Sequence, residues 1–410
     1  MENKCTPDIR FVGFTEDWEQ RKFFDNIKST IDFRGRTPKK LGLEWSDSGY
    51  LALSALNVKN GYIDPSADAH YGDEELYQKW MGGRELKQGQ VLFTTEAPMG
   101  NVAQVPDNKG YILSQRTIAF DVYENQMTND FLRVLLNSPK VFNELFSLSS
   151  GGTAKGVSQK SLSQLKVEVP KSLEEQTKIG NFFKQLDETI TLLQQELTNL
   201  KQTKQGFLQK MFPKEGEPVP EVRFPGFTGD WKQHKLKDIA VFNPKSVLPE
   251  QFEYVDLESV VGTNLISHRT EHRESAPSRA QRLAKQGDVF YQTVRPYQKN
   301  NYLFDLPYDN YVFSTGYAQM RPNVDSYFLF SKLQEEKFVS SVLDRCTGTS
   351  YPAINSNDLA QIEVGIPTLE EEQIKIGNFF KQLDDTISLH HRELEALKET
   401  KKAFLQKMFV

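Results

Sequence analysis

The chain has 410 residues, of which 38% are hydrophobic and 11% aromatic, and it carries a formal net charge of −5. This length predicts two or three domains with ample material for hydrophobic cores, and the composition excludes disordered and fibrous proteins. The negative net charge weakly disfavours a nucleic-acid partner, because phosphate binding requires a positive surface.

The sequence shows no feature of a secreted or membrane protein. No apolar run approaches the roughly 18 residues needed to cross a bilayer, and the first residues, MENKCTPDIRF, contain no apolar signal core. The two cysteines, Cys5 and Cys346, are too few for a disulfide framework or a metal quartet, which fits a reducing compartment. We therefore expect a cytoplasmic protein with no membrane partner.

The first half begins with a Trp-containing segment, residues 7–25, followed by a basic stretch. That stretch, FRGRTPKK at residues 33–40, contains four basic residues and no acid. Short apolar runs between Gly, Asn and Pro turns then predict strands at residues 49–53, 89–95, 111–122 and 165–170. Residues 128–148 predict a helix. The first half therefore has the pattern of a mixed α/β domain that ends in a long helix.

The second half repeats this order. Residues 174–212 and 371–409 are identical at 28 of 39 positions when shifted by 197, and the openings at 7–25 and 220–238 match at a shift of 213. The chain is therefore an internal tandem duplication whose second middle is 16 residues shorter. Residues 287–294, 311–322 and 361–367 predict strands, and residues 325–343 predict a helix. Residues 268–285 hold five Lys or Arg against two Glu.

Both closing segments have the heptad pattern of a coiled coil, with apolar positions at alternating spacings of four and three. A helix of 39 residues would be about 58 Å long, more than a globular domain needs. This length favours pairing of the two helices with each other over docking of each helix on its own domain. Gly180 and Gly377 lie beside the seams and suggest a close helix approach. The predicted helix-pairing residues are Ile179, Phe183, Leu186, Ile190, Leu193 and Leu197, and in the second copy Ile376, Phe380, Leu383, Ile387, Leu394 and Leu397.

Several stretches carry a family resemblance: RGRTPKKLG (34–42), YLALSALNVKNGYID (50–64), GQVLFTTEAPMGNVAQV (89–105), SQRTIAF (114–120), GGTAKGVSQKSLSQLKVEVP (151–170) and the repeated helix segment. With them, nearly the whole chain resembles the DNA-specificity subunit of type I restriction-modification enzymes. The second half departs from the pattern, because NPKS (243–246) replaces GRTPKK and GTSYPAINSNDLAQIEV replaces GTAKGVSQKSLSQLKVEV.

The repeat and the resemblance together imply an α+β fold with a pseudo-two-fold internal repeat. Two mixed α/β target recognition domains are joined by two long helices that pair as an antiparallel coiled coil. We expect target recognition domain 1 in residues 1–172, the central helix in 173–212, a linker in 213–220, target recognition domain 2 in 221–369 and the C-terminal helix in 370–410.

The resemblance also implies a function without catalysis by this chain. Each recognition domain would read one half of a split, asymmetric double-stranded DNA site. The paired helices would act as a spacer shorter than two turns of B-DNA, at roughly 34 Å per turn, and would dock two methyltransferase subunits. Motor-endonuclease subunits would join for restriction, and S-adenosylmethionine, ATP and Mg would be bound by the partner subunits. The alternative is a coiled-coil adapter that binds only proteins.

Basic and polar side chains in loop-like stretches are the candidates for DNA contacts, because they can clamp phosphates or pair with base edges. The alternatives are a solvated basic turn at residues 33–40, a flexible connector at residues 151–160 and, in the second half, ordinary surface residues. The candidates are Arg34, Arg36, Thr37, Lys39, Lys40, Gln115, Arg116, Lys155, Ser158 and Lys160, followed by Lys245, Arg269, Arg273, Arg279, Arg282, Arg295, Lys299, Asn300 and Asn355.

Other chemistries have little support. The chain contains no NPPY-like or DPPY-like tetrapeptide for amino methylation and no GxxxxGK[ST] phosphate loop, so we expect no catalytic residue. His268 and His272 are four residues apart but lack a third ligand, so we expect no metal site. His390 falls in the second seam, which we interpret as tolerated polarity, with pH-sensitive pairing as the alternative. Ser172 and Thr368 precede the heptads and are the predicted helix N-caps.

Overall fold

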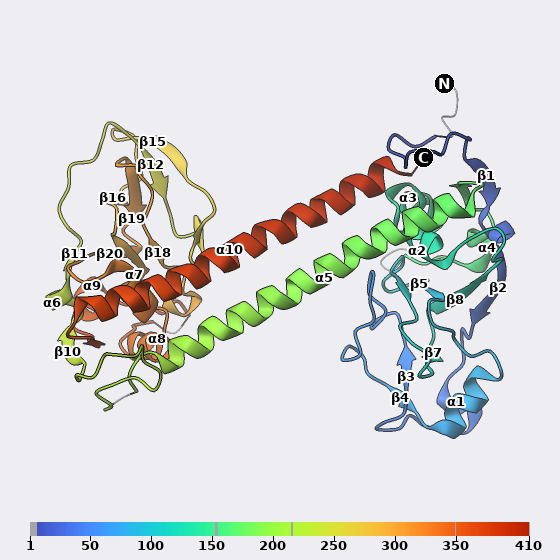
Figure 1. Cartoon of the computed structure of the whole chain (residues 1–410), viewed down its shortest axis with the longest axis horizontal. Helices are drawn as coiled ribbons and strands as arrows, with labels where there is room; N and C mark the ends of the chain where they lie inside the picture. The colour runs from blue at the N-terminus through green and yellow to red at the C-terminus, as the bar shows by residue number, and fades with distance from the viewer. Residues whose placement is uncertain (1–5, 152–154, 215, 349, 410) are drawn as a thin grey trace. The chain divides into compact units, whose positions relative to one another are not determined.

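The computed structural model of the chain describes residues 6–151, 155–214, 216–348 and 350–409. Its internal contacts divide the chain into two compact units (Figure 1). Unit 1 comprises residues 1–194 and 393–410, and unit 2 comprises residues 195–392. Each unit contains one predicted recognition domain together with parts of both long helices, whereas the predicted domain boundaries follow the chain.

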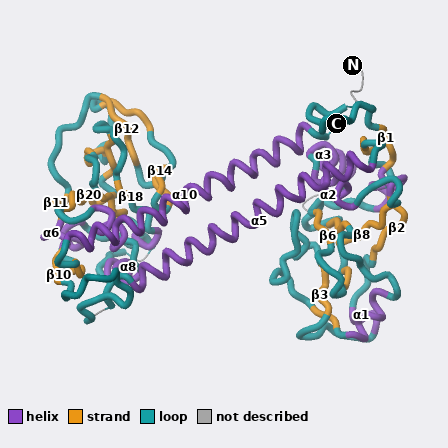
Figure 2. Tube along the Cα trace, in the orientation of Figure 1, coloured by secondary structure: helices purple, strands orange, loops and turns teal. Residues whose placement is uncertain are grey.

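Unit 1 contains strands β1 (Glu19–Lys22), β2 (Ile27–Asp32), β3 (Tyr50–Leu53), β4 (Tyr71–Gly72), β5 (Val91–Thr94), β6 (Val102–Gln104), β7 (Ile112–Leu113), β8 (Thr117–Val122) and β9 (Lys166–Val169). Its helical segments are η1 (Phe23–Asn26), η2 (Pro38–Leu41), α1 (Glu74–Met81), α2 (Asn129–Asn137), α3 (Pro139–Leu148), α4 (Gln159–Leu162) and the first part of α5 (Leu173–Lys210). The sheets have the orders β2-β8-β5-β6, β4-β3-β7 and β1-β9. Figure 2 shows β3, β6 and β8 between α1 and the pair α2 and α3.

Unit 2 contains β10 (Lys232–Lys235), β11 (Ala240–Phe242), β12 (Gln251–Val255), β13 (Val260–Val261), β14 (Asn264–Leu265), β15 (Arg269–His272), β16 (Ala280–Leu283), β17 (Val289–Gln292), β18 (Tyr302–Leu303), β19 (Tyr311–Ser314), β20 (Tyr317–Pro322) and β21 (Glu363–Ile366). Its helical segments are α6 (Leu236–Ile239), η3 (Pro296–Gln298), α7 (Ser326–Lys332), α8 (Glu336–Leu343), α9 (Ser356–Ala360) and the first part of α10 (Glu370–Lys407). The sheets β11-β20-β17-β18, β15-β12-β19-β16 and β10-β21 repeat the plan of unit 1, and β13 pairs with β14.

Two predicted elements of the first half are divided in the structure. The strand predicted at residues 111–122 becomes β7 and β8, because Arg116 adopts a left-handed conformation with φ of 64°. β7 pairs in parallel with β3, whereas β8 pairs with β2 and β5, so the chain passes from one sheet to the other here. The helix predicted at residues 128–148 breaks into α2 and α3 at Ser138, since the following Pro139 disfavours a helical conformation in the residue before it.

The core of unit 1 is completed by the end of α10. Met408 and Phe409 join a buried cluster with Trp18, Phe131 and Phe183. The rings of Trp18 and Phe409 meet edge to face with 5.9 Å between centroids. Burying one such side chain contributes about 1.5–3 kcal/mol, so the end of α10 is a substantial part of this core. Because Phe183 lies near the beginning of α5, the two helices run antiparallel within unit 1.

Unit 2 repeats this arrangement with the helices exchanged. Met211 and Phe212, which follow α5, join the buried cluster that contains Trp231, Phe328 and Phe380. The rings of Phe212 and Trp231 again meet edge to face, with 6.1 Å between centroids. The end of each long helix therefore fills the core of the unit in which the other long helix begins.

The two long helices pack together, and they do so through equivalent contacts in each unit. Phe182 and Phe404 lie 5.0 Å apart in unit 1, and Phe207 and Phe379 lie 4.9 Å apart in unit 2. All twelve residues predicted to pair the helices are buried or half-buried, namely Ile179, Phe183, Leu186, Ile190, Leu193, Leu197, Ile376, Phe380, Leu383, Ile387, Leu394 and Leu397. Among the described residues, no helix is both long and apolar enough to cross a membrane.

The two glycines beside the seams mark close packing on neighbouring short helices. A Cβ atom on Gly180 would lie 2.6 Å from Cβ of Asp130, at the start of α2. A Cβ atom on Gly377 would lie 2.2 Å from Oδ1 of Asp325, at the start of α7. The close helix approach is therefore that of α5 to α2 in unit 1 and of α10 to α7 in unit 2, and the absence of a side chain at each glycine permits it.

The starts of the long helices differ. Ser172 accepts a hydrogen bond from the Glu175 backbone at 3.4 Å, as expected for an N-cap. Thr368 instead donates its hydroxyl to the carbonyl oxygen of Asp230, and Leu369 occupies the position equivalent to Ser172. The prediction of an N-cap at Thr368 is therefore wrong, because the repeat places that residue one position before the cap.

Candidate nucleic-acid interface

The basic stretch of unit 1 folds into a compact turn around η2. Thr37 is its N-cap and accepts a hydrogen bond from the backbone of Lys40 at 3.3 Å. The Nζ of Lys40 donates to the carbonyl oxygen of Gly35 at 2.6 Å. Lys39 is exposed, and its side chain forms no hydrogen bond or ion pair with the described residues. Of these residues, Lys39 is thus the one whose charge is free for a phosphate.

Arg36 points into the protein. Its guanidinium donates to the carbonyl oxygen of Trp80 and lies 4.3 Å above the ring centroid of Phe33. The guanidinium of Arg84 lies 5.7 Å from the same ring centroid. The contacts of Arg36 with Trp80 and Phe33 hold the turn in place. The structure therefore gives the Arg36 side chain a positioning role.

Asp32 joins the two basic loops that the sequence singled out. It pairs with Arg34 at 3.0 Å and accepts a hydrogen bond from Nε2 of Gln159 at 2.8 Å. Ser158 is the N-cap of α4 and accepts from the Ser161 backbone at 3.0 Å, so its hydroxyl oxygen has a structural role. Lys160 is exposed, and its side chain has no polar partner within the described ranges.

A third group of candidate residues lies where the chain passes from β7 in one sheet to β8 in the other. Thr95 donates its backbone N–H to the Arg116 carbonyl at 2.8 Å, and its own carbonyl accepts from the Val157 N–H at 2.9 Å. We call this arrangement the Thr95 junction, comprising Thr95, Gln115, Arg116, Gly156 and Val157. Arg116 pairs with Glu96 at 3.0 Å, and both side chains are about half exposed.

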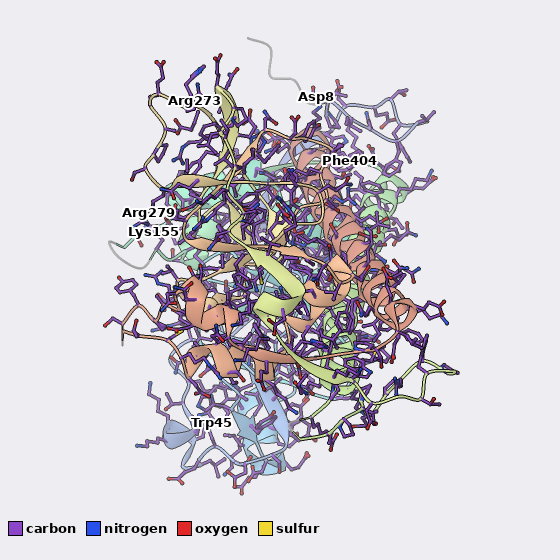
Figure 3. The ribbon with its side chains drawn as sticks, turned by 90° about the vertical axis from the view of Figure 1, so that its left-hand side faces the viewer. Asp8, Trp45, Lys155, Arg273, Arg279 and Phe404 are labelled. Atoms are coloured by element: carbon purple, nitrogen blue, oxygen red, sulfur yellow. The ribbon has the colours of Figure 1, made fainter. Side chains whose placement is uncertain are left out.

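A lysine and a pocket adjoin the Thr95 junction. Lys155 directly precedes Gly156 of the junction, and Gln115 and Arg116 line the pocket. Nζ of Lys155 lies 5.3 Å from the ring centroid of Phe146. The pocket has a volume of about 280 Å³ and is lined by Arg36, Thr37, Pro38, Trp45, Ala52, Ser54, Ala55, Leu56, Asp68, His70, Trp80, Ala97, Ser114, Gln115 and Arg116. The sequence had not indicated Trp45, which is half-buried and is labelled in Figure 3. The proximity of Trp45 to the basic, Gly-containing stretch in the sequence could have indicated it as a candidate.

Unit 2 has the same junction with different side chains. Thr293 donates its N–H to the Gly316 carbonyl at 2.9 Å, and its carbonyl accepts from the Ile354 N–H at 3.0 Å. We call this the Thr293 junction, comprising Thr293, Thr315, Gly316, Ala353 and Ile354. The backbone bonds correspond one by one to those of the Thr95 junction, since Thr315 and Gly316 follow β19 as Gln115 and Arg116 follow β7.

Two predicted arginines lie at the Thr293 junction. The carbonyl of Arg279 accepts a hydrogen bond from the Thr315 N–H at 2.8 Å. The side chain of Arg279 is exposed and forms no hydrogen bond, ion pair or ring contact with the described part of the chain (Figure 3). Arg295 donates its N–H to the Pro352 carbonyl at 2.8 Å, and its guanidinium lies 4.3 Å from the ring centroid of Tyr351. Tyr351 is exposed and was missed by the sequence analysis.

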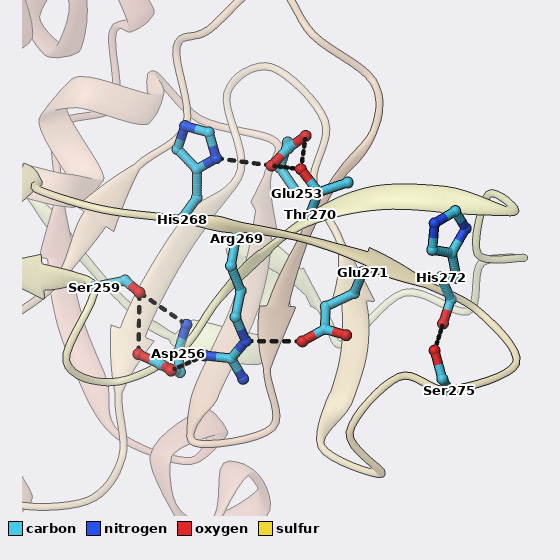
Figure 4. Close-up of polar contacts among 9 residues, drawn as sticks. All are labelled: Glu253, Asp256, Ser259, His268, Arg269, Thr270, Glu271, His272 and Ser275. Carbon is cyan, nitrogen blue, oxygen red and sulfur yellow. Dashed lines mark hydrogen bonds and ion pairs between the residues drawn. The ribbon is translucent and has the colours of Figure 1, made fainter.

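Arg269 is held in an acidic network instead (Figure 4). It donates to Glu271 and to Asp256, in each case at 2.8 Å, and these carboxylates raise the pKa of its guanidinium. Burial acts to raise the pKa of Asp256, but hydrogen bonds from Arg269 and Ser259 outweigh burial and hold that pKa below its ordinary value. The charge of Arg269 is therefore balanced within unit 2 and is poorly suited to phosphate binding.

Three other candidates of unit 2 have structural partners. Nζ of Lys299 contacts Glu336 at 2.5 Å, and Oδ1 of Asn300 accepts from the Gly262 N–H at 2.8 Å. Asn355 is the N-cap of α9 and accepts from the Asp358 backbone at 2.8 Å. These contacts stabilise loops and turns, so the three side chains serve the fold of unit 2.

The last three candidates lie away from the Thr293 junction. Lys245 is exposed without a polar partner among the described residues, and Arg273 donates to the Leu248 carbonyl at 3.2 Å at the end of β15. Arg282 on β16 is half-buried; burial lowers the pKa of its guanidinium, and within the described residues its Nε has no hydrogen-bond partner. Arg279 and Arg295 thus both have backbone hydrogen bonds at or next to the Thr293 junction, whereas no such bond is found for Lys245, Arg273 or Arg282 within the described residues.

The two histidines near Arg269 in the chain make contacts of their own, separate from the Arg269 network. Nδ1 of His268 lies 2.8 Å from Oε2 of Glu253, and the carbonyl of His272 accepts from the Ser275 hydroxyl at 3.4 Å (Figure 4). Within the described ranges, no group of three or more His, Cys, Asp or Glu side chains could hold a metal ion. Cys346 is half-buried with a free thiol, and Cys5 lies outside the described residues.

Comparison with known proteins identifies relatives of both halves. A family model described as the type I restriction modification DNA specificity domain matches residues 15–202 and 229–399. The HindI specificity subunit of Haemophilus influenzae is 28% identical over 196 residues, which cover 44% of this chain and 41% of that protein. The MjaVIII specificity subunit of Methanocaldococcus jannaschii is 22% identical over 95% of this chain and 91% of its own length.

Solved structures show the same fold. The crystal structure of a type I restriction-modification S subunit from M. genitalium superposes with a TM-score of 0.67 at 16% identity and covers 99% of both chains. A second structure, from work on complex assembly of the type I restriction-modification system, has a TM-score of 0.51 at 19% identity, covering 95% of this chain and 96% of its own. The fold of this chain is therefore one already seen in solved proteins.

Proposed function

Because the chain belongs to the type I restriction-modification DNA specificity family, we propose that it reads a split, asymmetric DNA site without carrying out chemistry itself. Unit 1 would read one half-site and unit 2 the other. The helices α5 and α10 would set the spacing between the half-sites. Because the DNA that it would bind lies in the cytoplasm, the subunit would work there.

The observation that carries this proposal is the pair of equivalent junctions with unlike side chains. Thr95 and Thr293 make the same backbone hydrogen bonds. Around them, unit 1 presents Gln115 and Arg116, whereas unit 2 presents Thr315 and Arg279. Base edges are distinguished by their hydrogen-bonding groups, so a constant scaffold with different side chains suits the reading of two different sequences.

The partners follow from the family and from the proposed task. Two methyltransferase subunits would dock on the long helices, and motor-endonuclease subunits would join them for restriction. S-adenosylmethionine, ATP and Mg would be bound by those subunits, and this chain would bind no cofactor. The names of the relatives, as specificity subunits of type I restriction enzymes, support this division of labour.

The proposal is tested by co-expressing the chain with its cognate methyltransferase subunit in a host that lacks adenine methylation. Modified adenines are then mapped across the genome by single-molecule sequencing. We expect a split motif with a fixed gap, and exchange of residues 18–170 for those of a relative should change one half of the motif only. A stable complex that methylates no defined motif would contradict DNA reading.

The alternative is an adapter in which both units bind proteins. The two functions differ in their response to salt, because phosphate contacts release counterions and protein contacts do not depend on them in this way. Binding of the chain–methyltransferase complex to duplex DNA that does not weaken between about 50 and 200 mM salt would favour the adapter.

A further inference from the structure

Gln115 is held in a single orientation at the Thr95 junction. Its Nε2 donates to the carbonyl oxygen of Arg36 at 2.7 Å. A carbonyl oxygen can only accept, so the NH2 group of the amide faces Arg36 and Oε1 faces away from it. Arg36 is itself fixed by the carbonyl of Trp80 and by the ring of Phe33. The loop thus fixes the amide before any ligand arrives.

The rest of this amide is available for a ligand. Oε1 and the second N–H form no hydrogen bond with the described residues, and Gln115 lines the pocket of about 280 Å³. The side chain therefore offers one acceptor and one donor next to each other. Adenine presents the complementary pair in the major groove, with N6 as donor and N7 as acceptor.

Unit 2 provides a comparison at the equivalent place. Thr315 stands where Gln115 stands in unit 1, and the Thr315 N–H is bonded to the carbonyl of Arg279. In both units an arginine carbonyl thus receives a hydrogen bond from this position, donated by the side-chain amide of Gln115 in unit 1 and by the backbone N–H of Thr315 in unit 2. The guanidinium of Arg36 is turned inward, whereas that of Arg279 is exposed and lacks a partner within the described residues. A free guanidinium fork is complementary to guanine O6 and N7.

We propose that Gln115 reads an adenine in the half-site of unit 1 and that Arg279 reads a guanine in the half-site of unit 2. This inference rests on the proposed function and deepens it by assigning two base-reading residues and the base that each one recognises. Arg36 is a positioning residue for Gln115. Each bidentate contact of this kind discriminates against other bases by roughly 5- to 150-fold.

The test is a binding selection with the purified chain–methyltransferase complex on a pool of randomised duplexes, followed by sequencing of the bound DNA. The variants are Gln115→Ala and Arg279→Ala. Their matched controls are Gln78→Ala, an exposed glutamine on α1, and Arg345→Ala, an exposed arginine after α8. The Arg279 side chain makes no polar or ring contact in the described structure, so we expect Arg279→Ala to leave unit 2 folded. The selection with Arg279→Ala therefore tests the proposal even if Gln115→Ala lowers the stability of unit 1.

For Gln115→Ala we expect one A·T position of one half-site to lose its selectivity by roughly 5- to 150-fold while the other half-site is unchanged. Arg279→Ala should relax one G·C position of the other half-site, and both controls should select the wild-type motif. Selection of the wild-type motif by both test variants, or relaxation at positions with other bases, would overturn this inference and leave the proposed function intact. If the wild-type complex selects no motif, the proposed function itself fails.

Discussion

Lys204 of α5 and Asp384 of α10 form an ion pair with 2.5 Å between Nζ and Oδ1. Lys401 and Asp187 form the equivalent pair in unit 1 at 2.6 Å. Both lysines occupy seam positions at which the heptad pattern expects an apolar residue. Polar residues in a coiled-coil seam reduce stability but can specify register and orientation, so we expect these pairs to favour the antiparallel arrangement of the two helices.

The first prediction concerns this ion pair. Lys204→Glu should destabilise unit 2, because it places two negative charges together in a half-buried seam. The double variant Lys204→Glu with Asp384→Lys should recover part of the loss, with a coupling energy of about 0.5–3 kcal/mol in urea unfolding. Lys201→Glu, at an exposed position of α5, is the matched control. Strictly additive effects of the two reversals would show that the pair does not contribute.

The second prediction concerns Arg10 and Glu175. The guanidinium donates two hydrogen bonds to the carboxylate, at 2.6 and 2.8 Å, and Glu175 is only 1% exposed. Arg10→Ala should lower the free energy of unfolding by about 3–5 kcal/mol, because it leaves a buried charge unpaired. Replacing both residues by Ala should cost less than the sum of the single changes. Glu174→Ala, at the exposed neighbouring position, is the control, and equal losses for Glu174→Ala and Glu175→Ala would contradict the assignment.

The third prediction compares two glycines of α5. Gly180→Ala would place Cβ 2.6 Å from the Asp130 side chain and 3.0 Å from the Asp130 carbonyl carbon, so we expect a destabilisation of about 1–3 kcal/mol. Gly206→Ala meets no atom within 4 Å, and Ala403 occupies the equivalent position in the second copy. Gly206→Ala should therefore stabilise the helix by up to about 1 kcal/mol. Thermal unfolding of both variants measures the difference, and a Gly180→Ala variant as stable as wild type would contradict it.

The fourth prediction is a pH dependence of unit 2. The pKa of Asp256 is lowered from its ordinary value of 3.8 by Arg269 and Ser259, which outweigh the effect of burial. A lowered folded-state pKa contributes stability that is fully present above the unfolded pKa and is lost as the pH falls through the folded pKa. Asp256→Asn should therefore reduce the melting temperature at pH 7. The difference from wild type should shrink below about pH 4. A difference that is constant from pH 7 to pH 3 would exclude this contribution.

The fifth prediction separates free lysines from internally paired residues. Lys39→Ala and Lys160→Ala should each reduce the slope of log affinity against log salt by about one when the chain–methyltransferase complex binds a specific duplex. Lys79→Ala, whose charge is already paired with Glu75 at 2.7 Å, should leave the slope unchanged. Arg36→Ala should instead lower the stability of unit 1. Slopes that stay at the wild-type value in both lysine variants would remove these residues from the interface.

Much of the architecture could be predicted because it depends on periodicity and repetition. The heptad spacing of α5 and α10 and the order of strands and helices are local patterns that survive duplication. The divisions of residues 111–122 and 128–148 were harder to see, although Pro139 marks one of them. The left-handed Arg116 separates β7 from β8 because these two strands pair in different sheets. No local sequence pattern shows such a change of sheet.

The sequence alone is enough to show that the chain is duplicated, that its halves end in long helices with apolar seams and that its basic residues lie in a few loops. Which of those basic residues are free depends on the three-dimensional fold. Arg269 is neutralised by Asp256 and Glu271, Arg36 is turned inward, and Arg279 is left exposed at the Thr293 junction. This is because the fold brings carboxylates or carbonyls within about 3 Å of some cations and not of others. Partners such as Asp256 for Arg269 and Trp80 for Arg36 are not neighbours in the sequence.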